Sequence, residues 1–242
     1  MAIVPYQDST ADKKSQVAQM FDSIAGKYDF LNHFLSAGTD IYWRRQAVNK
    51  LKDLRPARIL DIATGTADFA IETLRTAAPD AHVTGVDISE GMLEVGRRKL
   101  AQKGLGHRIQ LELGDSENLP FGDGEFDAVT ASFGVRNFAH LEVGLAEMRR
   151  VLRPGGQLVI LEFSKPTAFP LKQAYSFYFR RVLPVFGKLI SKDQSAYTYL
   201  PASVQAFPDG PDFLAILAKV GFKEPACQPL TFGISSIYTA RK

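Results

Sequence analysis

Short apolar runs alternate with amphipathic stretches through the middle of the chain. Residues 89–104, for example, combine Ser89 as an N-cap candidate with apolar side chains at helical spacing. The apolar runs are rich in Val, Ile and Leu and are bounded by Gly, Pro, Asp or Asn, which is typical of buried strands. They occupy residues 57–63, 82–88, 108–113, 126–132 and 157–163. Strands that alternate with helices predict a parallel sheet covered on both faces.

The tail departs from this alternation. Pro211 can open a helix that ends near Gly221. Two closely spaced strand-like runs follow, at residues 229–234 and 235–241. They predict an antiparallel hairpin at the edge of the sheet.

The N-terminal part also differs, because residues 1–54 contain only short helical stretches. We therefore expect an N-terminal helical lid at residues 1–54 and a catalytic domain at residues 55–242. A substrate-side insertion is expected within that domain at about residues 166–208.

Composition is that of an ordinary globular protein: 242 residues, 45% hydrophobic and 23% charged, with a formal charge of +3. This charge is too small to indicate nucleic acid as a partner. The single Cys227 excludes an intrachain disulfide and a cysteine-based zinc cluster, and no apolar run has the length of a signal or membrane segment. These features favour a reducing, cytoplasmic setting. No metal is expected, since His82, His107 and His140 lack metal-ligand spacing.

A tight turn follows the first predicted strand, where ligands bind in open α/β sheets. It runs from Asp61 to Asp68 and contains only Gly65, not the full G-x-G-x-x-G of a dinucleotide site. Asp61 and Asp68 have the alternative role of stabilising the turn. A nucleotide-dependent oxidoreductase is disfavoured by this incomplete glycine pattern.

Acidic residues follow the next two predicted strands. Asp87 ends the second strand, where a carboxylate can accept both hydroxyls of a ribose. Asp115 and Ser116 follow the third strand, where an adenine edge would lie. The fourth strand ends in SFGVRN. A nucleoside-containing ligand is therefore expected across these strand ends.

The order of these features resembles the class I S-adenosylmethionine (SAM)-dependent methyltransferases, and MRRVLRPGGQLVILEFS strengthens the likeness. More specifically, residues 21–43 and 150–164 resemble the two signature segments of the ubiquinone/menaquinone biosynthesis C-methyltransferases. SFGVRN, EFSKP and AYTYLPASVQAFP are also similar to that family. The resemblance covers about residues 17–242. Two departures are Asp40, where many members carry His, and the turn ATGTAD in place of a Gly-rich form.

The resemblance implies a Rossmann-like fold with a seven-stranded, mostly parallel sheet, SAM as cofactor, and a polyprenylated quinol as partner. The implied reaction is methylation of a ring carbon, with demethylmenaquinol as first choice. The alternatives are demethoxyubiquinol, another small aromatic or sterol-like acceptor, or a binding protein without chemistry. The expected cofactor contacts come from Asp61, Gly65, Thr66, Asp87, Asp115, Ser116 and Ser132.

Carbon methylation of a quinol requires stabilisation of a phenolate and removal of a ring proton. Arg136 and Asn137 follow the fourth strand on the carboxyl side of the sheet. We expect Arg136 to stabilise the developing phenolate, alone or with a bound water that takes the proton, while Asn137 orients it. The alternative is an arginine tied to Glu162 or to a backbone carbonyl.

The segment at residues 28–36 places Tyr28, Asn32 and Ser36 on one helical face and His33 beside them. Apolar residues alternate with this polar stripe, so the helix should cover a pocket. We expect Tyr28, Asn32 and His33 to contact the quinol head group. His33 could serve as a base, or as a core or capping histidine. Trp43 should pack the lid onto the body.

Residues 169–192 are dense in aromatic and aliphatic side chains and contain no acid. Unopposed bases within an apolar segment suit contact with anionic lipid or with a polyprenyl tail. Peripheral attachment to the inner face of the membrane is therefore expected. The alternative is a buried cap helix with solvated bases. A homodimer is also compatible with the sequence. The bases are Lys172, Arg180, Arg181, Lys188 and Lys192.

Overall fold

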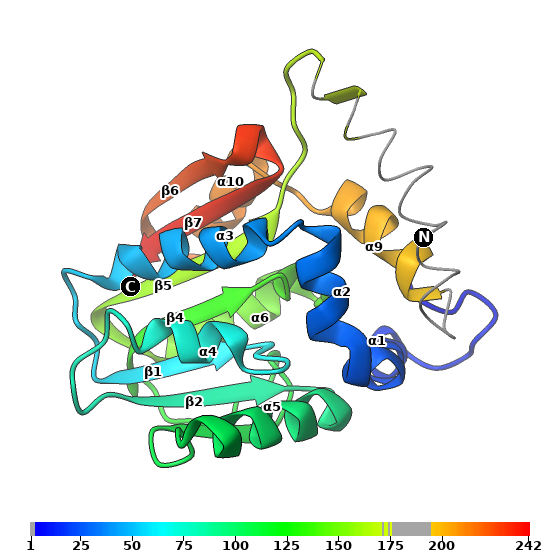
Figure 1. Ribbon diagram of the computed structural model, residues 1–242. Helices are drawn as coiled ribbons and strands as arrows, with labels where there is room; N and C mark the ends of the chain where they lie inside the picture. The colour runs from blue at the N-terminus through cyan, green and yellow to red at the C-terminus, as the bar shows by residue number, and fades with distance from the viewer. Residues whose placement is uncertain (1–2, 171, 174, 176–194) are drawn as a thin grey trace.

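The structure, a computed structural model, describes residues 3–170, 172–173, 175 and 195–242. A seven-stranded sheet lies at its centre, with helices on both faces (Figure 1). The strands are β1 (Arg58–Ile62), β2 (His82–Asp87), β3 (Ile109–Leu113), β4 (Phe126–Ser132), β5 (Leu152–Phe163), β6 (Lys223–Leu230) and β7 (Ser235–Arg241). The α-helices are α1 (Lys13–Ile24), α2 (Tyr28–Leu35), α3 (Thr39–Val48), α4 (Asp68–Thr73), α5 (Glu90–Lys103), α6 (Leu141–Val151), α9 (Ser195–Ala206) and α10 (Pro211–Val220). Short 3-10 helices are η1 (Ala25–Lys27), η2 (Asn49–Leu51), η3 (Val135–Asn137) and η5 (Thr231–Gly233).

The strand order is β3-β2-β1-β4-β5-β7-β6. β7 is antiparallel to both β5 and β6, whereas the ladders that join β3, β2, β1, β4 and β5 are parallel. The order in which the strands are added reverses between the parallel strands β1 and β4: β2 and β3 lie on one side and β5 on the other. Open α/β sheets bind ligands at such a point. The expected fold, a mostly parallel seven-stranded sheet with an antiparallel C-terminal hairpin, is confirmed.

Apolar side chains bury both faces of the sheet. On one face α6 and α10 contribute Leu145 and Phe213, which are fully buried. On the other face α3 packs over β5, α4 over β2, and α5 over β2 and β3, and Trp43 of α3 lies in the apolar cluster there. Trp43 is 3% exposed, and its indole N–H donates a hydrogen bond to Thr231 Oγ1 at 2.7 Å. Trp43 therefore packs the N-terminal part onto the body, as expected.

The helix ends follow the sequence signals. Ser89 Oγ accepts a hydrogen bond from the Met92 N–H, which caps α5, and Gly104 ends α5 in the left-handed conformation. Pro211 opens α10, and Gly221, at a φ of 98°, ends it. These boundaries agree with the prediction because capping residues act locally.

β6 begins earlier than the sequence pattern indicated. The predicted run at residues 229–234 is mostly the connection η5, and the strand is Lys223–Leu230. Pro225 and Pro229 interrupt the strand pattern in the sequence. A proline lacks the N–H that a central strand needs, but an edge strand tolerates it. β6 is the edge of the sheet, so both prolines fit there.

Helices α1, α2 and α9 lie together beyond the carboxyl ends of the central strands (Figure 1, right). Val17, Met20, Leu31 and Tyr199 join them in a small apolar cluster of their own. Division of the chain at residue 54 stays a prediction.

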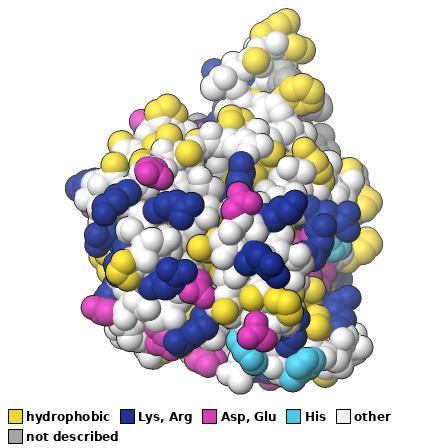
Figure 2. Space-filling view, turned by 90° about the vertical axis from the view of Figure 1, so that its left-hand side faces the viewer, with side chains coloured by type: hydrophobic (Ala, Val, Ile, Leu, Met, Phe, Trp, Pro, Cys, Tyr) yellow, Lys and Arg dark blue, Asp and Glu magenta, His cyan; other side chains and the backbone are white. Residues whose placement is uncertain are grey.

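The opposite edge of the sheet, at the amino ends of the strands, carries basic side chains interspersed with acidic ones (Figure 2). Arg58, at the start of β1, lies 2.5 Å from Glu125, and Arg153 lies 2.5 Å from Asp127. Exposed pairs of this kind contribute little to stability and keep the surface solvated. The buried carboxylates Asp61, Asp87 and Glu162 lie instead near the carboxyl ends of β1, β2 and β5.

Candidate active site

The turn between β1 and α4 approaches its neighbours closely. Ala63, Gly65 and Ala67 all have positive φ values, of 52°, 56° and 68°. Asp61 lies behind the turn and is fully buried, and its carboxylate accepts hydrogen bonds from Thr64 Oγ1 at 2.7 Å and from a hydroxyl of β4 at 2.6 Å. Asp61 thus occupies the turn-stabilising position that the sequence left open as an alternative.

Asp87 organises the next strand end. Its side chain is 8% exposed and accepts N–H groups from Gly65 at 2.7 Å and from Ser89 at 2.9 Å. Burial raises the pKa of Asp87 to about 6, although these backbone donors oppose the shift. The carboxylate is therefore fixed in place and can still accept further donors when it is ionised.

A pocket opens between these strand ends and helices α1 and α2. Most of the expected cofactor residues line it, namely Gly65, Asp87, Asp115, Ser116 and Ser132, together with the expected substrate residues Tyr28 and Asn137. The pocket also has apolar walls, including Val86, Met92, Phe133 and Phe138. Expected site residues from five segments of the chain are thus brought to one place.

Other expected residues lie beside this pocket and not in its lining. Thr66 donates a hydrogen bond from Oγ1 to Asp29 Oδ1 of α2 at 2.5 Å, and Asp61 is behind the turn. Arg136, Asn32 and His33 also stand outside the lining residues. Their neighbours show what each can do.

Arg136 is held in a defined orientation in the middle of η3. Its Nη1 donates to the Phe133 carbonyl and, at 2.8 Å, to Glu162 Oε1. Glu162 is fully buried, and the guanidinium also lies over the Phe163 ring at 5.4 Å. An arginine tied to Glu162 or to a backbone carbonyl is the alternative role that the sequence left open for Arg136. Its Nε remains buried without a hydrogen-bond partner in the described part of the chain.

Two further buried oxygens of the site also lack partners among the described residues. They are Ser132 Oγ, at the end of β4, and Asn137 Oδ1, on η3. Buried polar atoms are nearly always hydrogen-bonded in native proteins. The unpartnered atoms therefore mark places where a ligand can supply the missing donor or acceptor.

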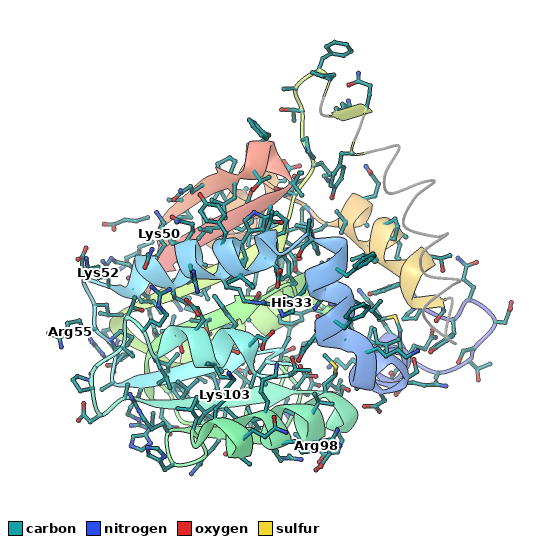
Figure 3. All side chains as sticks on the ribbon, viewed as in Figure 1. His33, Lys50, Lys52, Arg55, Arg98 and Lys103 are labelled. Atoms are coloured by element: carbon teal, nitrogen blue, oxygen red, sulfur yellow. The ribbon has the colours of Figure 1, made fainter. Side chains whose placement is uncertain are left out.

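Helix α2 presents the predicted polar stripe. Burial raises the pKa of Tyr28, whose hydroxyl is hydrogen-bonded to the Asn32 side chain and feels the charge of Arg136. His33 lies on the side of α2 that faces α4 (Figure 3), with Nδ1 2.8 Å from Asp40 Oδ2. Asp40 also accepts a hydrogen bond from Arg44 at 2.6 Å. Asp40 therefore binds the lid histidine and does not reach the pocket lining.

Sequence reasoning missed the contacts that hold α1 and α2 over the pocket. Lys14 lies 2.6 Å from Asp115, and Asp22 accepts hydrogen bonds from Ser89 Oγ at 2.6 Å and from the Gly91 N–H. Partners in these contacts are up to 101 residues apart, so periodicity and spacing carry no sign of them. Only the polar stripe of residues 28–36, which alternates with apolar residues, indicated that this segment covers a pocket.

Within the described residues, no cluster of three or more His, Cys, Asp or Glu side chains could hold a metal ion. The helices in that part of the chain are also too short or too polar to cross a membrane.

Comparison with known proteins agrees with this geometry. The profile of the ubiE/COQ5 methyltransferase family matches residues 9–242. Demethylmenaquinone methyltransferase of Bacteroides fragilis is 50% identical over 99% of this chain and 97% of that protein. The ubiquinone/menaquinone biosynthesis C-methyltransferase UbiE of Geobacter sulfurreducens is 48% identical over 96% of this chain and 90% of that protein.

A solved SAM-dependent methyltransferase from Thermotoga maritima has the same fold, with a TM-score of 0.66 and 20% identity over 93% of this chain and 99% of that one. A likeness at this level of identity concerns the fold alone. The family match and the relatives extend over nearly the whole chain. The chain therefore belongs to the ubiE/COQ5 methyltransferase family.

Proposed function

We propose that this protein transfers a methyl group from SAM to a ring carbon of a polyprenylated quinol, with demethylmenaquinol as the preferred acceptor. The observation that carries the proposal is a single pocket with two kinds of lining. Asp87 and Asp115 offer carboxylates for a nucleoside, and Tyr28 and Asn137 offer polar groups for an acceptor. The names of the relatives at 48–50% identity point to the same reaction.

The residues of the pocket fit SAM. Asp87, fixed by backbone N–H groups, would accept the ribose hydroxyls, and Asp115 and Ser116 would meet the adenine edge. Ser132 Oγ is buried and unpartnered within the described chain, as expected of a cofactor contact. Thr66 and Gly65 complete the turn, and bound SAM supplies an electrophilic methyl group.

The acceptor must be made nucleophilic, and its ring carbon must lose a proton after gaining the methyl group. We assign the first task to Arg136, because a cation beside the ring oxygen stabilises the developing phenolate. Asn137 orients this oxygen. Glu162 fixes Nη1 of Arg136, which leaves Nε for the acceptor or for a bound water that takes the proton.

The lid supplies the remaining contacts to the head group. Tyr28 lines the pocket, and Asn32 is hydrogen-bonded to it. His33 stays a candidate base on the lid, with Nδ1 2.8 Å from Asp40 Oδ2 and Nε2 4.0 Å from Asp68 Oδ2. Because α2 also contacts Thr66 of the cofactor turn, closure of the lid brings both reactants under one cover.

The acceptor ring is tested by an anaerobic assay with SAM and a short-tailed demethylmenaquinol kept reduced, with the product read by mass and by the site of the new methyl group. We expect ring-carbon methylation that stops when the quinol is oxidised, since an oxidised ring is not nucleophilic. Demethoxyubiquinol is assayed in parallel and should react more slowly. Intact SAM binding without transfer to either ring would refute the proposed function.

We also propose that the enzyme acts in the cytoplasm, peripherally at the inner face of the membrane, and that nucleic acid takes no part. The loop that ends at residue 170 projects from the body (Figure 1), and its Phe169 is 81% exposed. Most of the basic segment at residues 169–192 lies outside the described residues. Sedimentation with acidic liposomes should capture the protein at low salt and release it at high salt. Light scattering of the same sample tests for the homodimer with which the sequence is compatible.

A further inference from the structure

Tyr199 of α9 is a buried tyrosine whose hydroxyl has no partner in the described part of the chain. The residue is 4% exposed, and its ring packs with Val17, Met20 and Leu31 of the lid. The ring position is thus explained by apolar packing. The position of the hydroxyl is not, because a buried O–H without a hydrogen bond is unfavourable and rare.

This hydroxyl belongs to the neighbourhood of Arg136. Helix α9 packs against η3, which carries Arg136 and Asn137, and against α1. Burial raises the pKa of Tyr199 to about 12, and the charges of Arg136 and Glu162 both act on it. The phenol is therefore protonated near neutral pH and is available as a donor.

Three unpartnered atoms consequently come from adjoining segments. Arg136 Nε and the Tyr199 hydroxyl can donate hydrogen bonds, and Asn137 Oδ1 can accept one. A cationic donor on η3 and a neutral donor on the helix that packs against η3 suit an oxygen that carries partial negative charge. A phenolic oxygen on an aromatic ring is such a group.

We propose that Tyr199 is an acceptor-binding residue, whose hydroxyl donates a hydrogen bond to the quinol oxygen that Arg136 also contacts. This inference rests on the proposed function and adds a residue of α9 to the site. The acceptor is then held from two sides, by Tyr28 of α2 and by Tyr199 of α9. The apolar cluster of Val17, Met20 and Leu31 couples the placement of Tyr199 to the closed lid.

The test is Tyr199→Phe, which removes only the hydroxyl. We expect kcat/KM for short-tailed demethylmenaquinol to fall about ten-fold or more, the loss of one hydrogen bond to a polar acceptor. Affinity for SAM should not change. The melting temperature should stay the same or rise, because the hydroxyl has no partner in the protein to lose.

Tyr238→Phe is the matched control. Tyr238 is also fully buried, but it lies in β7, and its hydroxyl oxygen accepts a hydrogen bond from the Gly210 N–H at 2.8 Å. Removal of this hydroxyl should lower the melting temperature and leave kcat/KM unchanged. The two variants thus separate a ligand contact from a structural one.

Wild-type kinetics in Tyr199→Phe would overturn the inference, as would a loss of stability like that of Tyr238→Phe with unchanged kinetics. Binding of the same quinol to the protein with S-adenosylhomocysteine gives a second measurement, in which Tyr199→Phe should bind about ten-fold more weakly. Failure of the proposed function looks different, since the wild-type protein would then neither bind nor methylate the quinol.

Discussion

Acidification of the ligand-free protein is expected to raise its stability and to lower its affinity for SAM over the same pH range. The reason lies in Asp61 and Asp87, two buried carboxylates at the ends of β1 and β2. Burial raises the pKa of each from 3.8 to about 6, and the charge of Asp87 adds to the shift of Asp61. Both groups are ionised at neutral pH in surroundings that favour the neutral form.

The sign follows from proton linkage. Between the unfolded pKa near 4 and the folded pKa near 6, the folded protein binds more protons than the unfolded chain, so stability increases as the pH falls. A shift of about two units corresponds to roughly 3 kcal/mol for each group at full protonation. At about pH 5 we expect about 1.4 kcal/mol from Asp87 alone, or roughly 3–6 °C in the melting temperature. Glu147, whose pKa Arg150 holds below its usual value of 4.5, acts in the opposite direction, but most of its stabilisation is lost below pH 4.5.

SAM affinity should respond in the opposite direction. A protonated Asp87 has one fewer acceptor for the ribose hydroxyls, so the apparent dissociation constant should rise about ten-fold between about pH 7.5 and pH 5. Thermal unfolding without ligand and calorimetric titration with SAM, both across this range, measure the two effects. The control is Asp87→Asn, in which the affinity is weak and independent of pH.

A melting temperature that falls steadily from pH 7.5 to pH 5 would refute the reasoning on stability. A SAM affinity that stays constant across the same range would refute the role of Asp87 as the ribose acceptor. The two measurements are independent, so either part can fail alone.

Three further changes test other parts of the structure. Arg136→Lys should lower kcat about 100-fold at saturating quinol and leave SAM affinity intact, because an ammonium cannot contact Glu162 and the phenolate together. Single-turnover rates measure this effect, and wild-type turnover would exclude Arg136 from catalysis. Lys99→Met should speed SAM dissociation about 5-fold in stopped flow, because Lys99 Nζ of α5 lies 2.7 Å from Asp29 Oδ2 and so ties the lid to the catalytic domain. An unchanged rate would show that this ion pair does not hold the lid. Gly134→Ala should destabilise the protein by about 1–3 kcal/mol in urea unfolding, because its Cβ would clash with the Cβ of Ala63 in the β1 turn. A wild-type midpoint would contradict that close approach.

The sequence predicted the core of the sheet well because local signals sufficed there. β1, β2 and β4 are buried on both faces, so their runs of Val, Ile and Leu were unambiguous. β6 was placed too late because its two prolines resemble turn residues, and only the sheet order shows that it is an edge. A one-dimensional pattern contains no information on which strand lies at the edge.

The residues of the candidate site were likewise predicted only in part. Asp87 and Asp115 could be placed from sequence, because the carboxyl ends of neighbouring parallel strands meet at one edge. Lys14, Glu162 and Tyr199 could not, since each acts on a partner from a distant segment. Of these, Glu162 appeared only as an alternative partner for Arg136. Their roles depend on how the lid and α9 fold over the sheet, which spacing does not encode.

The features that lower the stability of this protein lie together at the carboxyl edge. Asp87 is ionised where burial favours its neutral form, and Tyr199 and Ser132 bury polar atoms that lack partners in the described chain. Ala63 and Phe133 adopt positive φ values of 52° and 56°. Each feature is unfavourable for folding, and a ligand can offset those that are unsatisfied polar groups by supplying the missing donor or acceptor. Binding is thereby linked to stability. We therefore expect ligand pairs that fill both halves of the pocket to stabilise the protein more than the sum of SAM and quinol alone, because each closes the same lid.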